Sequence, residues 1–345
     1  MYIDWESNFV KRLITSIFIV AGIALAFLLR MWTVWIFDAI VLLLAAVAVY
    51  EIAKTNQTEK RGVSVYYIGA YVACAYAMFV LGITTGFAVW LHLLMQVVVL
   101  FVFALYTLLM NYMDKEFAKD AKLKKQTLGR SSAISAGEFL KLVLYPTIML
   151  LVMIPLNHLG DFVTTTPVLS EEQATREMYK QYYVGQTLNV PMFATLGLLM
   201  IFAISCLTDT FAFCVGRILK GKKLCPKISP KKTISGAVGG LFGGVLGSLL
   251  VLVAFTNEAS LLQSFLTEKL GGSAIVLCLF IAIGIFGSVI TQMGDIYASI
   301  IKRRAGIKDF GKYLAGHGGA MDRLDGISWN SLFIFIVFFL IALIP

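Results

Sequence analysis

The sequence predicts an all-α protein that crosses a membrane several times. Of its 345 residues, 59% are hydrophobic and only 14% are charged, and its mean hydropathy is +0.83. Soluble domains are about 45–50% apolar and about 25% charged, so the composition excludes a soluble fold. The hydrophobic residues form runs that approach the roughly 20 residues needed to span a bilayer. In lipid the backbone polar groups of such a run must bond within the segment, which predicts helices.

Nine apolar runs are long enough to cross a bilayer, or nearly so. They are residues 13–29, 32–53, 65–83, 87–112, 139–158, 191–214, 234–256, 272–293 and 328–345. Lys and Arg concentrate before the first run and in every second connection after it. The positive-inside rule places these connections in the cytoplasm, with the N-terminus inside and the C-terminus outside. The same rule explains the net charge of +9, which therefore does not indicate nucleic-acid binding.

The seventh run contains a series of glycines at GxxxG spacing. The series is Gly236, Gly239, Gly240, Gly243, Gly244 and Gly247. In a membrane helix this pattern favours close packing against another helix. A phosphate-binding loop would need its glycines before the helix and not inside it. We therefore expect a packing face.

Polar residues are rare inside the runs. Asp38 follows Trp32 and Trp35 near the outer end of the second run, and we expect it to reach the membrane interface. The five cysteines form no CxxC pair, and the three histidines have no partners at metal-ligand spacing. This pattern argues against a zinc site.

The densest polar pattern lies in residues 294–325, between the last two apolar runs. If the eighth run continues as a helix, Asp295, Ser299 and Lys302 fall at i, i+4 and i+7 on one face. Asp322 and Asp325 are three residues apart and would share a face where the last helix begins. Carboxylates that face Lys and Arg are typical of a metal-assisted phosphate site.

This stretch also resembles a known family. The pattern Ser299-x-x-Lys302-Arg303-x4-Lys308-Asp309-x7-His317-Gly318-Gly319-x-x-Asp322-Arg323-x-Asp325 is similar to the signature of phosphatidate cytidylyltransferases, or CDP-diacylglycerol synthases. A second block resembles the same family: Asp209-Thr210, followed by Pro226-Lys227-Ile228-Ser229-Pro230-Lys231-Lys232-Thr233. Phe211 departs from the family, in which glycine is common at that position. The earlier spans match only in hydropathy.

The resemblance implies a Mg²⁺-dependent nucleotidyltransferase that converts CTP and phosphatidate to CDP-diacylglycerol and pyrophosphate. Chemistry agrees, because the attacking lipid phosphate has a second pKa of about 6 and is already largely ionised. The main obstacle is repulsion between two polyanions, which calls for metal and cations more than for a base. We expect residues 1–135 to form four spans with a basic cytoplasmic loop, and residues 136–345 to form the catalytic region of five spans.

Resemblance and chemistry together assign the site residues. The expected catalytic residues are Asp209, Asp295, Asp322, Lys232 and Lys302. The expected metal ligands are Asp295 and Asp322, with Asp209 and Asp325 as outer ligands or ligands of a second cation. The expected substrate-binding residues are Lys231, Ser229, Ser299, Arg303, Lys308, Asp309, His317, Gly318, Gly319 and Arg323.

Three local interpretations accompany these assignments. Ser229-Pro230 has the sequence of a helix start, which would leave free N–H groups beside the two lysines as an anion site. Gly318 and Gly319 would let backbone N–H groups approach the triphosphate. His317 could instead cap the last helix, and Lys308-Asp309 could be a surface pair.

The expected partners are CTP, phosphatidate and the lipid bilayer, but no nucleic acid, and a homodimer is left open. The expected location is the inner membrane if the source is a bacterium, with the active site on the cytoplasmic side. Two alternative enzymes act on other lipids: a CDP-archaeol synthase on another lipid phosphate, or a polyprenol kinase on a lipid alcohol. From another class, an ion or solute transporter also carries intramembrane acids.

Overall fold

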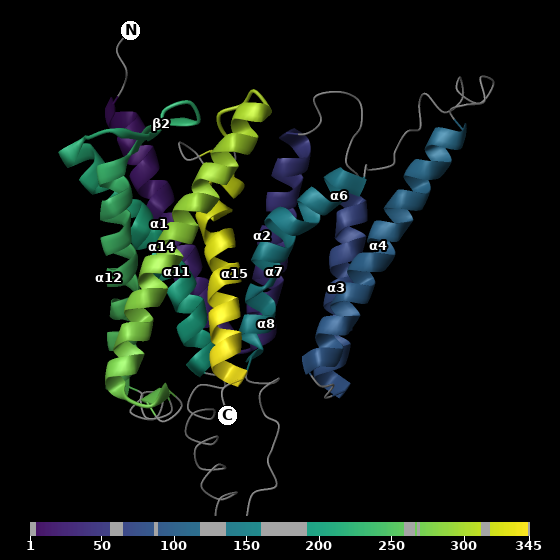
Figure 1. Cartoon of the computed structure of the whole chain (residues 1–345), viewed down its shortest axis with the longest axis horizontal. Coiled ribbons are helices and arrows are strands. Elements are labelled where there is room, and N and C mark those ends of the chain that lie inside the picture. The colour runs from purple at the N-terminus through teal and green to yellow at the C-terminus, as the bar shows by residue number, and fades with distance from the viewer. Residues whose placement is uncertain are drawn as a thin grey trace, which may run out of the picture. The chain divides into compact units, whose positions relative to one another are not determined.

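The structure is a computed structural model, and it describes residues 5–55, 65–85, 89–117, 136–159, 192–258, 266–267, 270–311 and 318–343 (Figure 1). The regular secondary structure of these residues is helical apart from a two-stranded hairpin. The long helices are α1 (Trp5–Arg30), α2 (Val34–Thr55), α3 (Val65–Thr85), α4 (Val89–Phe117), α11 (Met192–Leu219), α12 (Ile234–Glu258), α14 (Ser273–Arg304) and α15 (Met321–Leu343).

The fifth predicted run is broken into four short helical pieces. They are α6 (Ala136–Leu142), a π-helical turn η1 (Val143–Ile148), α7 (Met149–Leu151) and α8 (Met153–Asn157). Pro146 explains the break, because proline lacks the N–H that a regular helix needs at that position.

Eight helical stretches of the described residues are long and apolar enough to cross a membrane. They lie in α2, α3, α4, α11, α12, α14 and α15 and in the broken run Phe139–Asn157, and α1 adds a shorter apolar stretch at Phe18–Arg30. Together they account for the nine predicted runs. The prediction of an all-α polytopic membrane protein is therefore confirmed. The placement of the N-terminus inside and the C-terminus outside stays a prediction.

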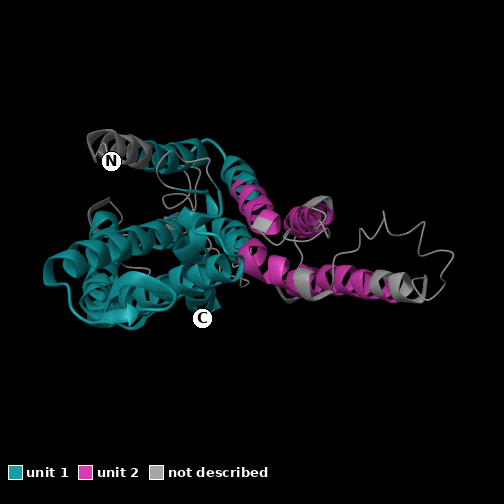
Figure 2. Cartoon of the chain, turned by 90° about the horizontal axis from the view of Figure 1, so that it is seen from above, with its two compact units in different colours: residues 1–43, 149–345 teal, residues 44–148 magenta. Residues whose placement is uncertain are grey.

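The chain forms two compact units, residues 44–148 and residues 1–43 with 149–345 (Figure 2). In the first of these, Tyr67 of α3 packs against Phe103 of α4 and Phe139 of α6, with ring centroids 5.3 and 5.4 Å apart. The Tyr67 hydroxyl also donates to the Phe103 carbonyl at 2.7 Å. The basic loop predicted before residue 135 lies outside the described residues, and the predicted division at that residue stays a prediction.

The other unit is built around α12, which packs closely against α11 through its glycines. A Cβ added to Gly236 would lie 2.7 Å from the Ala212 carbonyl oxygen, and one added to Gly247 would lie 2.8 Å from that of Ala203. A Cβ on Gly243 would approach the backbone of Leu207 even more closely. Only hydrogen fits between the two backbones, so the predicted packing face is confirmed.

Replacing Gly243 with alanine is expected to destabilise the protein by about 1–3 kcal/mol, because the added methyl group meets backbone that cannot move aside. Thermal unfolding in detergent measures the effect. Gly22→Ala is the matched control, since nothing lies within 4 Å of a Cβ at that helical position. Equal unfolding temperatures for the two variants would contradict the packing argument.

Asp38 is buried within the protein, and its predicted placement at the level of the membrane interface stays a prediction. Its side chain is fully buried, and it accepts a hydrogen bond from Asn157 Nδ2 at 2.8 Å and pairs with His158 Nε2 at 2.8 Å. Arg30 Nε donates to Asn157 Oδ1 at 2.6 Å. A buried acid is tolerated where neighbouring helix ends supply donors. Those donors lie about 120 residues away along the chain, which is why the sequence did not reveal them.

Candidate active site

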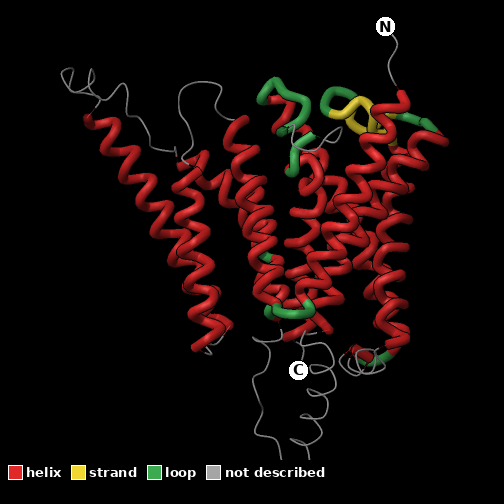
Figure 3. Tube along the Cα trace, turned by 180° about the vertical axis from the view of Figure 1, so that it is seen from behind, coloured by secondary structure: helices red, strands yellow, loops and turns green. Residues whose placement is uncertain are grey.

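The candidate site lies at one end of the helical bundle, where α11 and α14 end and α15 begins (Figures 1 and 3). The connection between α11 and α12 forms a hairpin at the same end. Its strands are β1 (Lys223–Cys225) and β2 (Ser229–Thr233), paired antiparallel with Lys223 opposite Thr233. The two sequence blocks that resemble one family therefore meet in space.

The hairpin changes the predicted start of α12. Ser229 and Pro230 lie in β2 and not at the start of a helix. The helix begins at Ile234, and Thr233 caps it by accepting a hydrogen bond from the Gly236 N–H at 3.1 Å. The prediction of a Ser229-Pro230 cap was wrong because strand pairing extends to Thr233, where a hydroxyl residue also precedes the apolar run.

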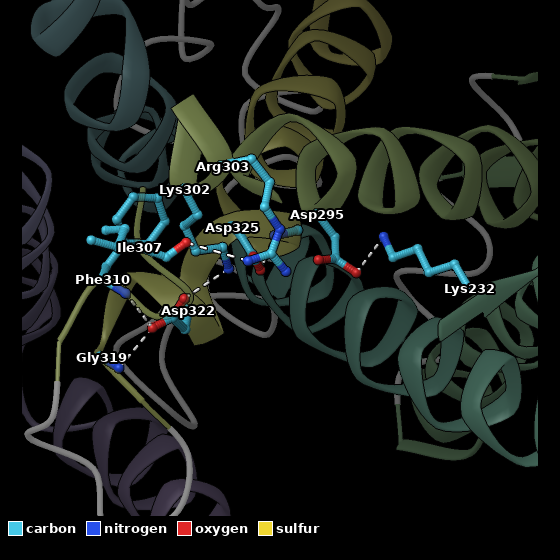
Figure 4. A network of polar contacts seen from close by, with 10 residues as sticks. Lys232, Asp295, Lys302, Arg303, Ile307, Phe310, Gly319, Asp322 and Asp325 are labelled. Carbon is cyan, nitrogen blue, oxygen red and sulfur yellow. Dashed lines mark hydrogen bonds and ion pairs between the residues drawn. The ribbon is translucent and has the colours of Figure 1, made fainter. Parts of the chain in front are cut away.

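The side chains of Lys231 and Lys232 lie on opposite sides of β2. Successive side chains of a strand point to opposite sides. Lys232 points toward α14 and forms an ion pair with Asp295, with Nζ and Oδ2 2.6 Å apart (Figure 4). Lys231 is exposed. Of the two lysines predicted to bind phosphate, Lys232 is therefore the one that the structure brings to the acids.

Helix α14 continues to Arg304, as the spacing of Asp295, Ser299 and Lys302 predicted. It ends in a Schellman motif at Gly306, which has a φ of +69°. The Ile307 N–H donates to the Lys302 carbonyl at 2.9 Å, and the Gly306 N–H donates to that of Arg303 at 3.2 Å. This turn fixes the direction in which the chain leaves α14.

Three carboxylates from three helices converge near Lys232. They are Asp209 of α11, Asp295 of α14 and Asp325 of α15. Asp209 interacts electrostatically with Asp295, and Asp325 interacts with both of the others. The cations within reach are Lys232 and Arg323 for Asp209, and Lys302 for Asp325. The sequence separates these acids by up to 116 positions (325 − 209), so their convergence is a product of the fold.

This acid cluster fits a hard cation. Its oxygen-only donors are those that Mg²⁺ prefers, and three mutually repelling carboxylates are stabilised by a positive charge between them. Within the described part of the chain, no three acidic, His or Cys side chains are close enough to hold a metal ion unaided. An incomplete protein shell suits Mg²⁺, which usually keeps several waters and takes phosphate oxygens as further ligands.

Asp322 is engaged differently from the other three acids. Its Oδ1 pairs with Lys302 Nζ at 2.8 Å, and its Oδ2 accepts from the N–H groups of Phe310 and Gly319 at 2.9 and 2.8 Å (Figure 4). Its side chain is only 5% exposed. In this arrangement Asp322 organises the connection between α14 and α15. Its predicted role as a metal ligand finds no support in these contacts.

The turn at Gly318 and Gly319 brings the backbone against the Asp322 carboxylate. Gly318 has a φ of +85°, and a Cβ there would lie 2.7 Å from Asp322 Oδ2, so glycine is required at this position. The Gly319 N–H donates to Asp322. Its predicted approach to a triphosphate stays a prediction. His317 lies outside the described residues, and both of its predicted roles stay predictions.

The remaining predicted residues lie around the cluster. Arg303 Nε donates to the Ile228 carbonyl at 3.3 Å and so links α14 to the hairpin. Arg323, Lys308 and Asp309 are exposed, while Ser229 and Ser299 are half-buried. The exposure of Lys308 and Asp309 accords with a surface pair, but their predicted substrate role stays a prediction.

Sequence reasoning missed Phe310. Its N–H binds Asp322, and its ring lies below the Lys302 ammonium, with Nζ 5.1 Å from the ring centroid. A cation above an aromatic face is stabilised by the ring quadrupole. A phenylalanine in a loop carries no local signal of such a role.

Comparisons with known proteins support the family that the two sequence blocks, in residues 209–233 and 294–325, resemble. Residues 10–341 match the Cytidylyltransferase family. The chain is 37% identical over 140 residues to a phosphatidate cytidylyltransferase of Rickettsia conorii, covering 41% of this chain and 56% of the relative. It is 38% identical over 130 residues to one of Brucella abortus, covering 38% and 42%, respectively. The matched region thus spans about half the length of these relatives.

Proposed function

Because this chain belongs to the cytidylyltransferase family, we propose that it transfers the cytidylyl group of CTP to phosphatidate, giving CDP-diacylglycerol and pyrophosphate. The observation that carries the proposal is the convergence of Asp209, Asp295 and Asp325 beside Lys232 at one end of an apolar helical bundle. Relatives named phosphatidate cytidylyltransferase support the choice of acceptor.

The proposed chemistry requires two negatively charged molecules to meet. Asp209, Asp295 and Asp325 would hold Mg²⁺, which when bound neutralises phosphate oxygens and stabilises the departing pyrophosphate. Lys232 and Arg323 would bind phosphate oxygens around it. Lys232 is suited to this because its ion pair with Asp295 is partly exposed, and an incoming phosphate can compete for the ammonium group.

The lipid phosphate itself would attack the α-phosphorus of CTP. Its second pKa is about 6, so it is mostly ionised at neutral pH and needs no protein base. The bond between the α-phosphorus and the bridging oxygen breaks, and pyrophosphate leaves with that oxygen. The position of the acids at the end of the bundle suits a lipid whose phosphate lies at the membrane surface. The positive-inside pattern favours the cytoplasmic side for this end.

The decisive experiment supplies the purified full-length protein with Mg²⁺, phosphatidate and CTP labelled at the α- or the γ-phosphate. We expect α-label in the lipid product and γ-label in pyrophosphate. Omission of Mg²⁺ should abolish both products. Phosphatidate, an ether-linked lipid phosphate and a polyprenol are compared as acceptors.

Each alternative function gives a different result in the same experiment. Transfer of γ-label to a polyprenol would establish a kinase, and a preference for the ether-linked phosphate would change the acceptor. Failure to label any lipid, together with ion flux in liposomes without CTP, would overturn the enzyme proposal in favour of a transporter.

A further inference from the structure

A layer of buried polar side chains lies beneath the three acids. It consists of Ser205, Thr291 and Asn330, which are 2%, 0% and 0% exposed. The Asn330 Nδ2 group donates to Ser205 Oγ at 3.1 Å, and the hydroxyl groups of Ser205 and Thr291 lie 3.4 Å apart. Asn330 Nδ2 also donates to the Ile201 carbonyl at 3.1 Å. These contacts connect α11, α14 and α15.

Each member of the layer lies about one helical turn from an acid of the site. Ser205 precedes Asp209 by four residues on α11, and Thr291 precedes Asp295 by four on α14. Asn330 follows Asp325 by five residues on α15, which runs in the opposite direction. At about 1.5 Å per residue these separations are roughly 6 to 7.5 Å along the helix axes. The layer therefore joins the same three helices that carry the acids.

The orientation of the Asn330 amide is set by its surroundings. Its nitrogen donates to the Ile201 carbonyl, which can only accept, so the reverse orientation would place two oxygens together. The amide oxygen faces Gly287, where an added Cβ would lie 3.0 Å from it. The small Gly287 on α14 thus leaves room for Asn330 of α15, and the amide has one usable position.

Repulsion among the three acids favours separation of the helices that carry them. Like charges repel, and the repulsion is strong where water is scarce. The Lys232–Asp295 ion pair compensates one member of the cluster, and Arg323 and Lys302 lie within reach of Asp209 and Asp325, respectively. A set of hydrogen bonds one turn deeper opposes separation of the helices, because these buried interhelical bonds would have to break before the helices move apart.

We propose that Ser205, Thr291 and Asn330 are positioning residues that fix the register of α11, α14 and α15, so that Asp209, Asp295 and Asp325 meet around one divalent cation. The inference rests on the metal site of the proposed function and deepens it. Asn330 has the central role because it bonds directly to α11 and its amide packs against α14. The residues act through the acids and do not touch the substrate.

The test measures Mn²⁺ binding to the purified full-length protein by electron paramagnetic resonance, without CTP or added lipid substrate. Asn330→Leu has similar size but removes both donated hydrogen bonds. We expect it to weaken Mn²⁺ binding by about tenfold or more, as loss of outer-shell partners commonly does. Thr291→Val should also weaken binding, whereas Thr291→Ser retains the hydroxyl and should bind nearly as tightly as the natural protein.

Ser248→Ala provides the matched control. Ser248 is fully buried and its hydroxyl donates to the Phe280 carbonyl at 2.9 Å, which links α12 to α14. Phe280 lies 15 residues before Asp295 (295 − 280), about 22 Å away along the helix. This variant loses a comparable interhelical bond but should leave Mn²⁺ binding unchanged.

The outcomes separate this inference from the proposed function. Unchanged Mn²⁺ binding in Asn330→Leu, or equal weakening in Ser248→Ala, would overturn the positioning role. If Asn330→Leu does not fold, the comparison of Thr291→Val with Thr291→Ser decides the question. No Mn²⁺ binding by the natural protein would overturn both the metal site and the layer's role. If Asn330→Leu weakens Mn²⁺ binding but the natural protein transfers no cytidylyl label, the positioning role of the layer is supported and only the proposed reaction is refuted.

Discussion

Asp295→Asn is expected to lower Mg²⁺-dependent CTP turnover by about a thousandfold, while the protein stays folded and inserted. The substitution preserves shape but removes the charge that faces both the proposed cation and Lys232. Metal-borne charge stabilisation is worth several kcal/mol, and each ~1.4 kcal/mol corresponds to a factor of ten. Turnover is measured with saturating CTP and phosphatidate across a wide range of Mg²⁺ concentrations.

Two controls make this result interpretable. Thermal unfolding should be nearly unchanged, because Asp295 is 34% exposed and its surface ion pair contributes little to stability. Lys223→Gln, which removes an exposed charge from the same hairpin, should retain turnover. A rate for Asp295→Asn close to that of the natural protein would show that the acid cluster is not the metal site.

Asp322→Asn is expected to act mainly on the fold of the site. The ion pair with Lys302 is largely buried, with side chains 12% and 5% exposed. Loss of one partner leaves the other charge buried and unpaired, which lowers the free energy of unfolding by about 3–5 kcal/mol. We expect a strong fall in both turnover and unfolding temperature, because the loop between α14 and α15 loses its anchor for Lys302, Phe310 and Gly319.

The double variant Lys302→Met/Asp322→Asn distinguishes this role from metal binding. Removing both charges should restore much of the stability that either single change costs, since neither residue of this buried pair is then left charged without its partner. Turnover should stay low, because Lys302 also lies within reach of Asp325. Mn²⁺ binding to folded Asp322→Asn should be much less affected than binding to Asp295→Asn. Equal loss in the two variants would restore Asp322 to the set of metal ligands.

Local patterns allowed much of the fold to be predicted. Apolar runs placed the nine helical segments, GxxxG spacing predicted the close approach of α12 to α11, and residue spacing placed Asp295, Ser299 and Lys302 on one helix. Each of these properties repeats within a few residues. They depend on helix period and on the solvent that surrounds the helix, both of which the sequence carries directly.

The parts that could not be predicted depend on residues far apart in the chain. Ser205 and Thr291 meet across 86 residues, and Asn330 meets Ser205 across 125. The same limit applies to Asp322, whose motif suggested a metal ligand while Phe310 and Gly319 supply its actual donors. A motif identifies which side chains gather in a region, but packing decides which of them pair with each other.

The length of α14 has a consequence for where chemistry can occur. Its 32 residues extend about 48 Å, whereas the hydrocarbon core of a bilayer is about 30 Å thick. Asp295 lies 22 residues after Ser273 (295 − 273), about 33 Å along the axis. A helix that enters the hydrocarbon core at Ser273 emerges from it shortly before Asp295, which would bring the carboxylates to the level of the lipid headgroups. A soluble nucleotide can reach that height from the water, and a lipid can reach it without leaving its leaflet.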